Sequence, residues 1–405
     1  MTVGSGPVVG RERELAAVEA FAAGEPYAGE ALLLAGEAGI GKTTIWRHGV
    51  EAAAEAGRRA LTARPAGAEA DFSFAALGDL VGAVREDLLP GLSAPQRRAL
   101  DVALLLEEAG GRGADRRAVS LAILNGFRTL AADAPVLVAV DDVQWLDPPS
   151  ASVLAFAARR LQGQPVAFLL ARREDESGPT PLEHALGTEL ARIDVGPLSL
   201  EALHEVLHAR LGTALPRPVL RRIHELAAGN PFYALELARA VERDAVALAP
   251  DRALPVTLEL LVRDRLGTLP PKAQRALALA GALAQPTVAV VAAAADEDVY
   301  AALEPAVDAH VVTLHGERIE FAHPLLASGA YLSVEPAERR AIHRRLAAAV
   351  PEPEERARHL ALAADGPDAD VAAALDEAAA GARARGAPDA AALLTERALL
   401  LTPEA

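Results

Sequence analysis

Cysteine is absent from this chain of 405 residues, and lysine is almost absent. The lack of cysteine excludes disulfides and thiolate metal sites, and it suits a reducing compartment, so we expect a cytoplasmic protein. Of the 40 basic residues, only Lys42 and Lys272 are lysines. A lysine in this chain therefore indicates that its position requires a compact ammonium charge.

Signal peptides and membrane spans are not predicted either. The first residues, MTVGSGPVVGRERE, contain no apolar core of the signal-peptide kind. The uncharged run 276–295 approaches membrane-spanning length, but it is mostly alanine and is interrupted by Gln285 and Pro286. We interpret this run as two helices of a soluble protein, because proline ends or kinks a helix.

Positive charge is in deficit as well. The formal net charge is −16 at pH 7, which argues against broad nucleic-acid affinity because phosphate backbones attract clustered Lys and Arg. Apolar residues make up 51% of the chain and charged residues 24%, a composition typical of globular proteins. The length predicts roughly two to four domains.

Short apolar runs alternate with helical patterns in the first half of the chain. Helices are expected at 12–23 and 43–55, and the predicted strands are 31–35, 135–140, 165–171 and 191–195. Strands that alternate with helices predict a doubly wound α/β domain with a parallel sheet. We place this domain at residues 1–197.

Helices dominate the rest of the chain. We expect an all-α helical domain at 198–254 and a winged-helix domain at 255–350, since one hairpin (311–314 with 318–321) interrupts the helices there. Residues 351–405 resemble the start of α-helical, TPR-like repeats, with helices at 354–364, 370–384 and 389–401. Such repeats need about three units to be stable, so we interpret the chain as a fragment or a short relative of something longer.

The strongest motif is GEAGIGKT at residues 36–43, which fits the P-loop pattern G-x-x-x-x-G-K-[ST]. Lys42 is expected to reach the β- and γ-phosphates, Thr43 to ligate Mg²⁺ and Thr44 to lie near the α-phosphate. The backbone expected to contact phosphates is that of Gly36, Ala38, Gly39, Ile40 and Gly41. The alternative, a glycine-rich turn with an exposed lysine, is disfavoured by the apolar strand before the loop and the helix after it.

A second motif is the apolar run 136–140 followed by Asp141 and Asp142. We expect Asp141 to hold Mg²⁺ through water, and Asp142 to orient or deprotonate the attacking water. The alternative is an Asp-rich turn after a strand. Together, the two motifs predict binding of ATP or ADP with Mg²⁺ and catalytic roles for Lys42 and Asp142.

Weaker signals concern three further side chains. Arg173 follows a predicted strand and could contact the γ-phosphate, although Arg172 is an equal candidate by position. Pro231 could place its ring against adenine, or could mark a plain turn between helices. His323 could contact the β-phosphate, or could cap or pack. The ten histidines show no metal-ligand spacing, so zinc is not expected.

These motifs together resemble the signal-transduction (STAND) ATPases, an AAA+-related, additional-strand P-loop class. More narrowly, residues 8–350 resemble the N-terminal ATPase part of large ATP-binding LuxR-type transcriptional regulators. The resemblance implies an added strand between the P-loop strand and the Mg-aspartate strand. The matching motifs are Val9-Gly10-Arg11 with the residues up to Leu15, Asp141 to Asp147, Gly229 to Phe232, and Phe321 to Leu325 with the helix around His343.

The resemblance also implies residue roles. It places Val9, Gly10 and Arg11 beside adenine, supports the adenine contact of Pro231, and favours Arg173 over Arg172 as the sensor. A histidine often stands at the Gln144 position in this family, so the role of Gln144 is left open.

An ATP-dependent switch is the function that the resemblance implies. In this family the ADP form is closed, and an inducer bound by the C-terminal repeats, with ATP, opens it for self-association until slow hydrolysis resets it. Direct DNA binding by this chain is not expected, because no helix-turn-helix domain is found. The alternatives are an origin-recognition-type ATPase that loads onto DNA and a P-loop small-molecule kinase.

Overall fold

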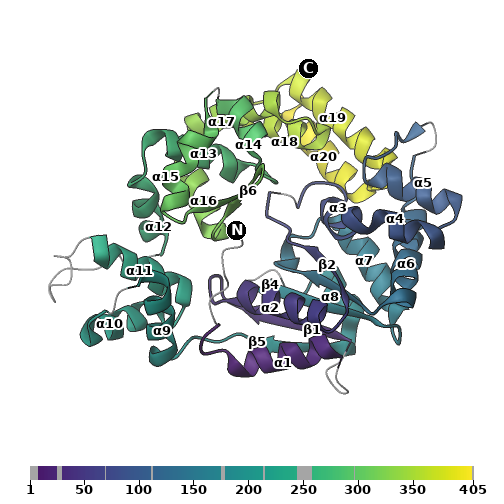
Figure 1. Cartoon of the computed structure of the whole chain (residues 1–405). Helices are drawn as coiled ribbons and strands as arrows, with labels where there is room; N and C mark the ends of the chain where they lie inside the picture. The colour runs from purple at the N-terminus through teal and green to yellow at the C-terminus, as the bar shows by residue number, and fades with distance from the viewer. Residues whose placement is uncertain are drawn as a thin grey trace. The chain divides into compact units, whose positions relative to one another are not determined.

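The computed structural model describes residues 8–24, 30–68, 70–110, 113–174, 178–212, 215–243, 258–295 and 297–403. The chain forms two compact units (Figure 1). Unit 1 contains Met1–Pro65, Phe74–Glu108 and Ala114–Leu254, and unit 2 contains Ala66–Ser73, Ala109–Gly113 and Pro255–Ala405. The expected domain boundary at 254/255 lies outside the described residues.

Unit 1 is built on a parallel sheet, as expected from the sequence. The strands are β1 Ala31–Gly36, β2 Arg59–Ala63, β3 Val136–Val140, β4 Val166–Arg173 and β5 Leu190–Asp194, in the order β2-β3-β4-β1-β5. The added strand β4 lies between the P-loop strand β1 and the Asp141 strand β3, and every pairing in this sheet is parallel.

Strand β2 is missing from the sequence prediction. It pairs with β3 at the edge of the sheet, and only Leu61 and Ala63 within it are buried. An edge strand with one covered face alternates apolar and polar residues, whereas the central strands β1 and β3 are buried throughout and read as continuous apolar runs. The search for apolar runs therefore found the central strands and missed this one.

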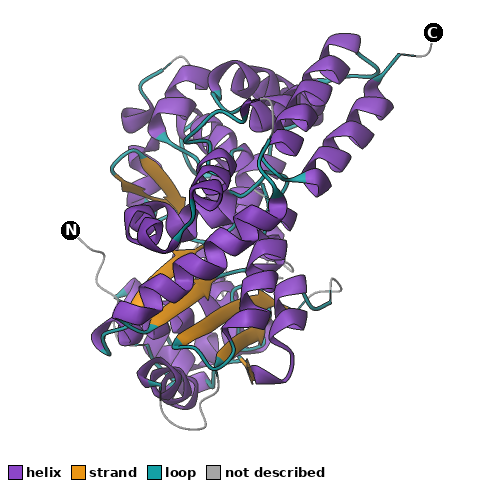
Figure 2. Cartoon of the chain, turned by 90° about the vertical axis from the view of Figure 1, so that its right-hand side faces the viewer, coloured by secondary structure: helices purple, strands orange, loops and turns teal. Residues whose placement is uncertain are grey.

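Helices α1 (Glu12–Ala23) and α2 (Lys42–Glu55) pack on the sheet beside each other. Figure 2 shows the larger group of orange strands among the purple helices of this unit. A Cβ atom on Gly49 of α2 would lie 2.3 Å from Cγ1 of Val18 in α1, so the close approach of the two helices requires glycine there.

The other helices of unit 1 agree with the helical patterns, including the all-α segment after residue 198. They are α3 Ala75–Val81, α4 Arg85–Leu88, α5 Ala94–Ala103, α6 Arg116–Asp133, α7 Pro148–Leu161, α8 Pro181–Leu186, α9 Leu200–Leu211, α10 Arg217–Ala227 and α11 Pro231–Arg243. A short 3₁₀ turn, Val143–Trp145, follows β3.

Unit 2 is helical apart from the expected hairpin, β6 Val312–His315 with β7 Arg318–Phe321, which turns through Gly316 at φ +60°. Its helices are α12 Leu258–Gly267, α13 Pro271–Ala282, α14 Val288–Ala295, α15 Val299–Asp308, α16 Pro324–Leu332, α17 Pro336–Ala349, α18 Pro353–Ala363, α19 Ala369–Ala384 and α20 Pro388–Leu401. The run 276–295 is divided between α13 and α14, as expected. Throughout the described ranges, no helix has the length and apolar character needed to cross a bilayer.

A short segment between β2 and α3 belongs to unit 2, which no sequence pattern predicted. Within this segment, Ser73 donates its backbone N–H to Oε2 of Glu354 at 2.9 Å, and Asp71 pairs with Arg397 at 2.9 Å. Glu354 is only 2% exposed, and Arg385 also donates to it. Removal of one member of a buried pair such as Glu354–Arg385 typically costs about 3–5 kcal/mol, and Ser73 attaches the segment to this pair.

Two buried imidazoles connect helices α17 and α18. Nδ1 of His343 lies 2.9 Å from Nδ1 of His359, and the Tyr331 hydroxyl lies 2.8 Å from Nε2 of His343. Burial lowers the pKa of His343 to about 4 and that of His359 to about 3, with Arg358 contributing repulsion to both. The Glu355 carboxylate lies 3.9 Å from Nε2 of His359. Both rings are therefore neutral at pH 7.

Acid is expected to destabilise unit 2 through this pair. The unfolded chain takes up protons near the ordinary histidine pKa of 6.5, whereas the folded pair does so only near pH 4 and below. The unfolded state binds more protons between these values, so stability falls as the pH decreases from 6.5 to 4. Urea unfolding at pH 7, 6 and 5 measures this slope. A His343→Gln/His359→Gln variant is expected to lose part of it, and equal slopes would contradict the assignment.

Candidate functional site

The loop between β1 and α2 contains the P-loop motif. Strand β1 ends at Gly36, and helix α2 begins at Lys42. Gly39 and Gly41 have φ values of +79° and +111°, which residues with a Cβ rarely adopt. A Cβ on Gly39 would also lie 2.9 Å from Cβ of Phe232. Glycine is thus required at position 39 for both conformation and space.

Lys42 folds back over this loop. Its Nζ donates to the carbonyls of Gly36 and Glu37, at 2.9 and 2.8 Å. The side chain is only 6% exposed, and burial lowers its pKa from 10.5 to about 8 despite the opposing attraction of Asp142. A poorly solvated ammonium group next to a helix N-terminus is well placed to receive an anion.

The next three loop carbonyls are held by groups from other parts of unit 1. The pairs are Asn230 Nδ2 to Ala38 O at 2.9 Å, the backbone N–H of Phe232 to Gly39 O at 3.4 Å, and Arg11 Nη2 to Ile40 O at 2.8 Å. These three hydrogen bonds fix the carbonyls of the loop and so restrict its conformation. The N–H groups of Ile40 and Thr44 are used locally, donating to the carbonyls of Glu37 and Gly41.

Arg11 supports the loop from the side of the opening motif. Besides Ile40, its guanidinium donates to the carbonyl of Gly196 at 2.7 Å and pairs with Glu14 at 3.1 Å. Gly10 has φ +69°, and a Cβ there would lie 2.3 Å from Cβ of Ala202. Val9 is half-buried. These contacts show Arg11 as a brace for the P-loop, and the expected contact of residues 9–11 with adenine stays a prediction.

Asp141 and Thr43 meet at the edge of the sheet. A hydrogen bond from the Thr43 side chain reaches the Asp141 carboxylate, which is 3% exposed, and Arg64 lies 3.7 Å from its Oδ2. Burial and repulsion from Asp142 raise the pKa of Asp141, while Arg64 and Thr43 oppose the rise. A hydroxyl and a carboxylate that share a buried position form the hard oxygen donor set that Mg²⁺ prefers.

Asp142 faces an arginine rather than solvent. Nε and Nη2 of Arg173 lie 3.3 and 3.4 Å from its two carboxylate oxygens, and Nε2 of Gln144 donates to Oδ1 at 2.9 Å. The Arg173 guanidinium stacks over the Trp145 ring at 4.2 Å. Asp142 itself adopts a left-handed backbone, with φ +48°. The structure therefore brings the Asp142 carboxylate and the Arg173 guanidinium together beside the P-loop.

Arg172 faces another part of unit 1. It pairs with Glu183 of α8 at 3.3 Å and donates to the carbonyl of Gly178 at 2.6 Å. Successive side chains of a strand point to opposite faces, which separates Arg172 from Arg173. Of the two arginines that the sequence left open by position, the structure brings Arg173 to Asp142.

The turn before α11 lies against the P-loop. Pro231 is the first residue of α11, between Asn230 and Phe232, whose contacts with the loop are given above. Gly229 has φ +72°, and a Cβ there would lie 2.7 Å from the carbonyl oxygen of Leu198. The motif thus supplies a contact with the P-loop through Asn230, which the sequence analysis did not assign. The glycine directly before Asn230 was a signal in the sequence that could have indicated a close approach there.

His323 lies in unit 2, where it caps helix α16. Its Nδ1 accepts the backbone N–H of Leu325 at 3.2 Å. This is the capping role that the sequence analysis kept as an alternative. The contact of His323 with a β-phosphate stays a prediction.

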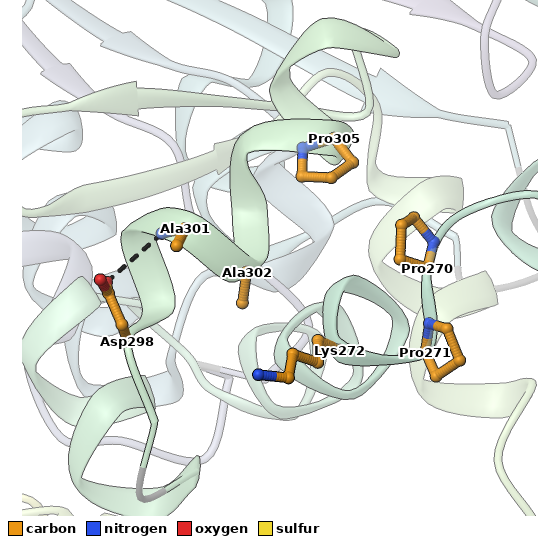
Figure 3. Close-up of a pocket in the computed structure, with 7 residues that line it drawn as sticks. All are labelled: Pro270, Pro271, Lys272, Asp298, Ala301, Ala302 and Pro305. Atoms are coloured by element: carbon orange, nitrogen blue, oxygen red, sulfur yellow. Dashed lines mark hydrogen bonds between the residues drawn. The ribbon is translucent and has the colours of Figure 1, made fainter.

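Unit 2 also contains a hollow of about 360 Å³ between the start of α13 and helix α15 (Figure 3). The Asp298 carboxylate already accepts backbone N–H groups at the start of α15, and Lys272 is 71% exposed and 3.8 Å from Glu297. The remaining lining is mainly proline and alanine. The polar groups of this hollow thus serve local structure. Among the described residues, no cluster of three potential metal ligands of the His, Asp and Glu type is present.

The comparisons with known proteins agree with this fold. Residues 7–170 match the family model of the AAA ATPase domain. No curated protein is similar enough to the chain to count as a match. Among solved structures, the chain is similar to a STAND (signal transduction ATPase with numerous domains) protein with a tetratricopeptide repeat sensor from Pyrococcus horikoshii. The identity is 16% and the TM-score 0.56, covering 98% of this chain and 60% of that one.

Two further structures are more distant. A Walker-type ATPase of Pyrococcus abyssi has 16% identity and a TM-score of 0.40, covering 79% of this chain and 95% of that one. The ORC1 protein of Aeropyrum pernix, in complex with DNA, has 17% identity and a TM-score of 0.36, covering 84% and 93%. Residues 7–170 thus match an AAA ATPase domain, and the chain has a parallel-sheet P-loop ATPase fold followed by a helical region.

Proposed function

We propose that this chain is an ATP/ADP-dependent molecular switch that binds ATP with Mg²⁺ and hydrolyses it slowly. The proposal depends on one observation: the P-loop, Lys42, the Thr43–Asp141 pair and the Asp142–Arg173 pair lie together at one edge of the sheet. The AAA ATPase match supports nucleotide and Mg²⁺ as the ligands.

Each residue has a distinct task in this proposal. The backbone of residues 36–41 and the Lys42 ammonium bind the phosphates, and Thr43 and Asp141 hold Mg²⁺, which supplies positive charge against the phosphate oxygens when bound. Asp142 orients the attacking water and accepts its proton. Arg173 contacts the γ-phosphate, and Pro231 and residues 9–11 lie beside adenine.

Slow turnover is supported by the Asp142–Arg173 pair. Both groups must act on the γ-phosphate end of the nucleotide, yet each is engaged with the other at 3.3–3.4 Å. Arg173 must rearrange toward phosphate before the carboxylate is available for water. A step of this kind, placed before chemistry, suits hydrolysis used for timing.

We extend the proposal to the helical region. Residues 255–350 act as a winged-helix module, with His323 sensing the nucleotide, and the helices from 351 onward are the first of TPR-like repeats that bind an inducer or partner protein. In this proposal the chain is the cytoplasmic ATPase part of a signal-transduction regulator of the LuxR type. ATP then favours self-association, because it binds the open and closed states with different affinities.

The nucleotide carried by the purified chain tests this function directly. We expect bound ADP or ATP to be released on denaturation and identified by chromatography, with steady-state hydrolysis well below about 1 s⁻¹. Turnover near or above that rate without an activator would count against the switch. Salt-sensitive DNA binding, titrated at two salt concentrations, would favour the origin-recognition-type alternative.

A further inference from the structure

We infer that Gln144 is a positioning residue that holds Asp142 and Arg173 in register and so controls hydrolysis without binding nucleotide. The inference rests on the proposed ATPase function. It concerns a position whose role the sequence left open, and the hydrogen bonds of this one side chain carry it.

The Gln144 amide uses both of its ends at the site. Its Nε2 donates to Oδ1 of Asp142 at 2.9 Å, and its Oε1 accepts the backbone N–H of Arg173 at 3.2 Å. One side chain thereby connects Asp142, the second residue after β3, to Arg173, the last residue of β4. The same amide orients the carboxylate and holds the backbone from which the guanidinium projects.

The sheet itself explains why this bridge is needed. Strand β3 ends at Val140, opposite Leu170, while β4 continues to Arg173. The N–H of Glu174 bonds to Gly36 in β1, so by strand alternation the N–H of Arg173 faces the side of β3. No strand residue of β3 remains there to accept it, and the Gln144 side chain takes that place.

The Gln144 hydrogen bond also helps to hold Asp142 in an uncommon backbone conformation. The left-handed backbone of Asp142, φ +48°, is a conformation that residues with a Cβ atom adopt uncommonly. The 3₁₀ turn Val143–Trp145 begins directly after it and carries both Gln144 and Trp145. Trp145 stacks on Arg173, so the turn contacts the arginine by its ring as well as by the amide.

Only certain side chains can replace this amide. An amide donates and accepts at the same time, and a neutral imidazole does so as well, whereas an ionised carboxylate only accepts. Glutamate at position 144 would repel Asp142 unless it carried a proton. Leucine would neither donate nor accept.

The experiment compares Gln144→Leu, Gln144→Glu and a control, Gln162→Leu, at an exposed position at the end of α7. We expect Gln144→Leu to lower kcat by about 10- to 100-fold, since water positioning by a base contributes about that much or more. Its Kd for ADP should stay within about twofold of the parent, and the control should change neither value.

The pH profile separates positioning from mere structural support. Hydrolysis by Gln144→Glu, relative to the parent, should recover as the pH falls from 8 to 5, because the protonated carboxyl again donates to Asp142. Parallel profiles, or equal loss of ADP binding and hydrolysis in the leucine variant, would overturn the inference. Unchanged kcat in Gln144→Leu would do so too.

Tryptophan emission distinguishes failure of this inference from failure of the proposed function. Trp46 is buried and donates to Leu169, so a difference spectrum between Gln144→Leu and the parent reports mainly Trp145. We expect a shift comparable to that of Arg173→Ala. If the parent shows no hydrolysis, the proposed function fails, while the Trp145 spectrum still tests the bridge: no shift then refutes it.

Discussion

Lys42→Ala is expected to weaken nucleotide binding by about 100-fold or more. Charge-assisted hydrogen bonds contribute about 1.5–3 kcal/mol each, and a factor of ten in Kd corresponds to about 1.4 kcal/mol, so loss of an ammonium shared by two phosphates reaches this range. Titration with ADP and ATP by calorimetry measures the effect. The substitution also removes the donor that holds the carbonyls of Gly36 and Glu37, which loosens the cradle.

The second lysine is the matched control. Lys272 is 71% exposed in unit 2 and lies 3.8 Å from Glu297, so Lys272→Ala should leave both affinities within about twofold of the parent. Equal losses in the two variants, or unchanged binding in Lys42→Ala, would contradict the assignment of the P-loop.

The lowered pKa of Lys42 adds a pH signature to the same measurement. Its ammonium form binds phosphate, and its pKa in the free protein is about 8. As the pH rises through 8, the free protein loses this proton and must regain it to bind, so the affinity for ADP should fall between pH 7 and pH 9. The Lys42→Ala variant should lack this part of the pH dependence.

Asp142→Asn is expected to slow ATP hydrolysis by about 10²–10⁴-fold, the usual contribution of a general base, while ATP still binds. The amide cannot accept a proton from water, but it fills the same space next to Arg173 and Gln144. Removal of a negative charge near the phosphates should leave affinity unchanged or slightly improved.

Asp141→Asn provides the contrast for this prediction. Asp141 is the residue that shares a hydrogen bond with Thr43, so its substitution should reduce the Mg²⁺ dependence of ATP binding. If Asp142→Asn lost ATP binding, or if the two variants behaved alike, the separate tasks of the two aspartates would be wrong. Single-turnover hydrolysis and ATP titration with and without Mg²⁺ distinguish these outcomes.

Parts of the fold were predictable because their signals are local. The apolar runs that became β1, β3 and β4 are buried on both faces, and burial of that kind leaves a continuous hydrophobic segment in the sequence. The P-loop motif is equally local, since strand, loop and helix follow one another without interruption. The β6–β7 hairpin was predictable for the same reason, because its two-residue turn contains glycine.

Other parts depend on residues that are far apart in the chain. Asn230 and Arg11 reach the P-loop across 192 and 29 positions, and Ser73 reaches Glu354 across 281. Local propensity carries no information about such pairs. The edge strand β2 was missed because only one of its faces is buried. Polar side chains such as Arg59 and Thr62 therefore interrupt the apolar run that would have marked it as a strand.

The sequence by itself determined the kind of chemistry, since a phosphate cradle needs glycines with positive φ beside a lysine, and a cation needs carboxylates at the end of a buried strand. Only the tertiary structure decided which further side chains surround the phosphate cradle and the carboxylates. It separated Arg172 from Arg173, paired Arg173 with Asp142, and placed the Gln144 amide between them. The physical reason is that hydrogen bonds depend on direction and distance across neighbouring strands, which the order of residues along one strand does not contain.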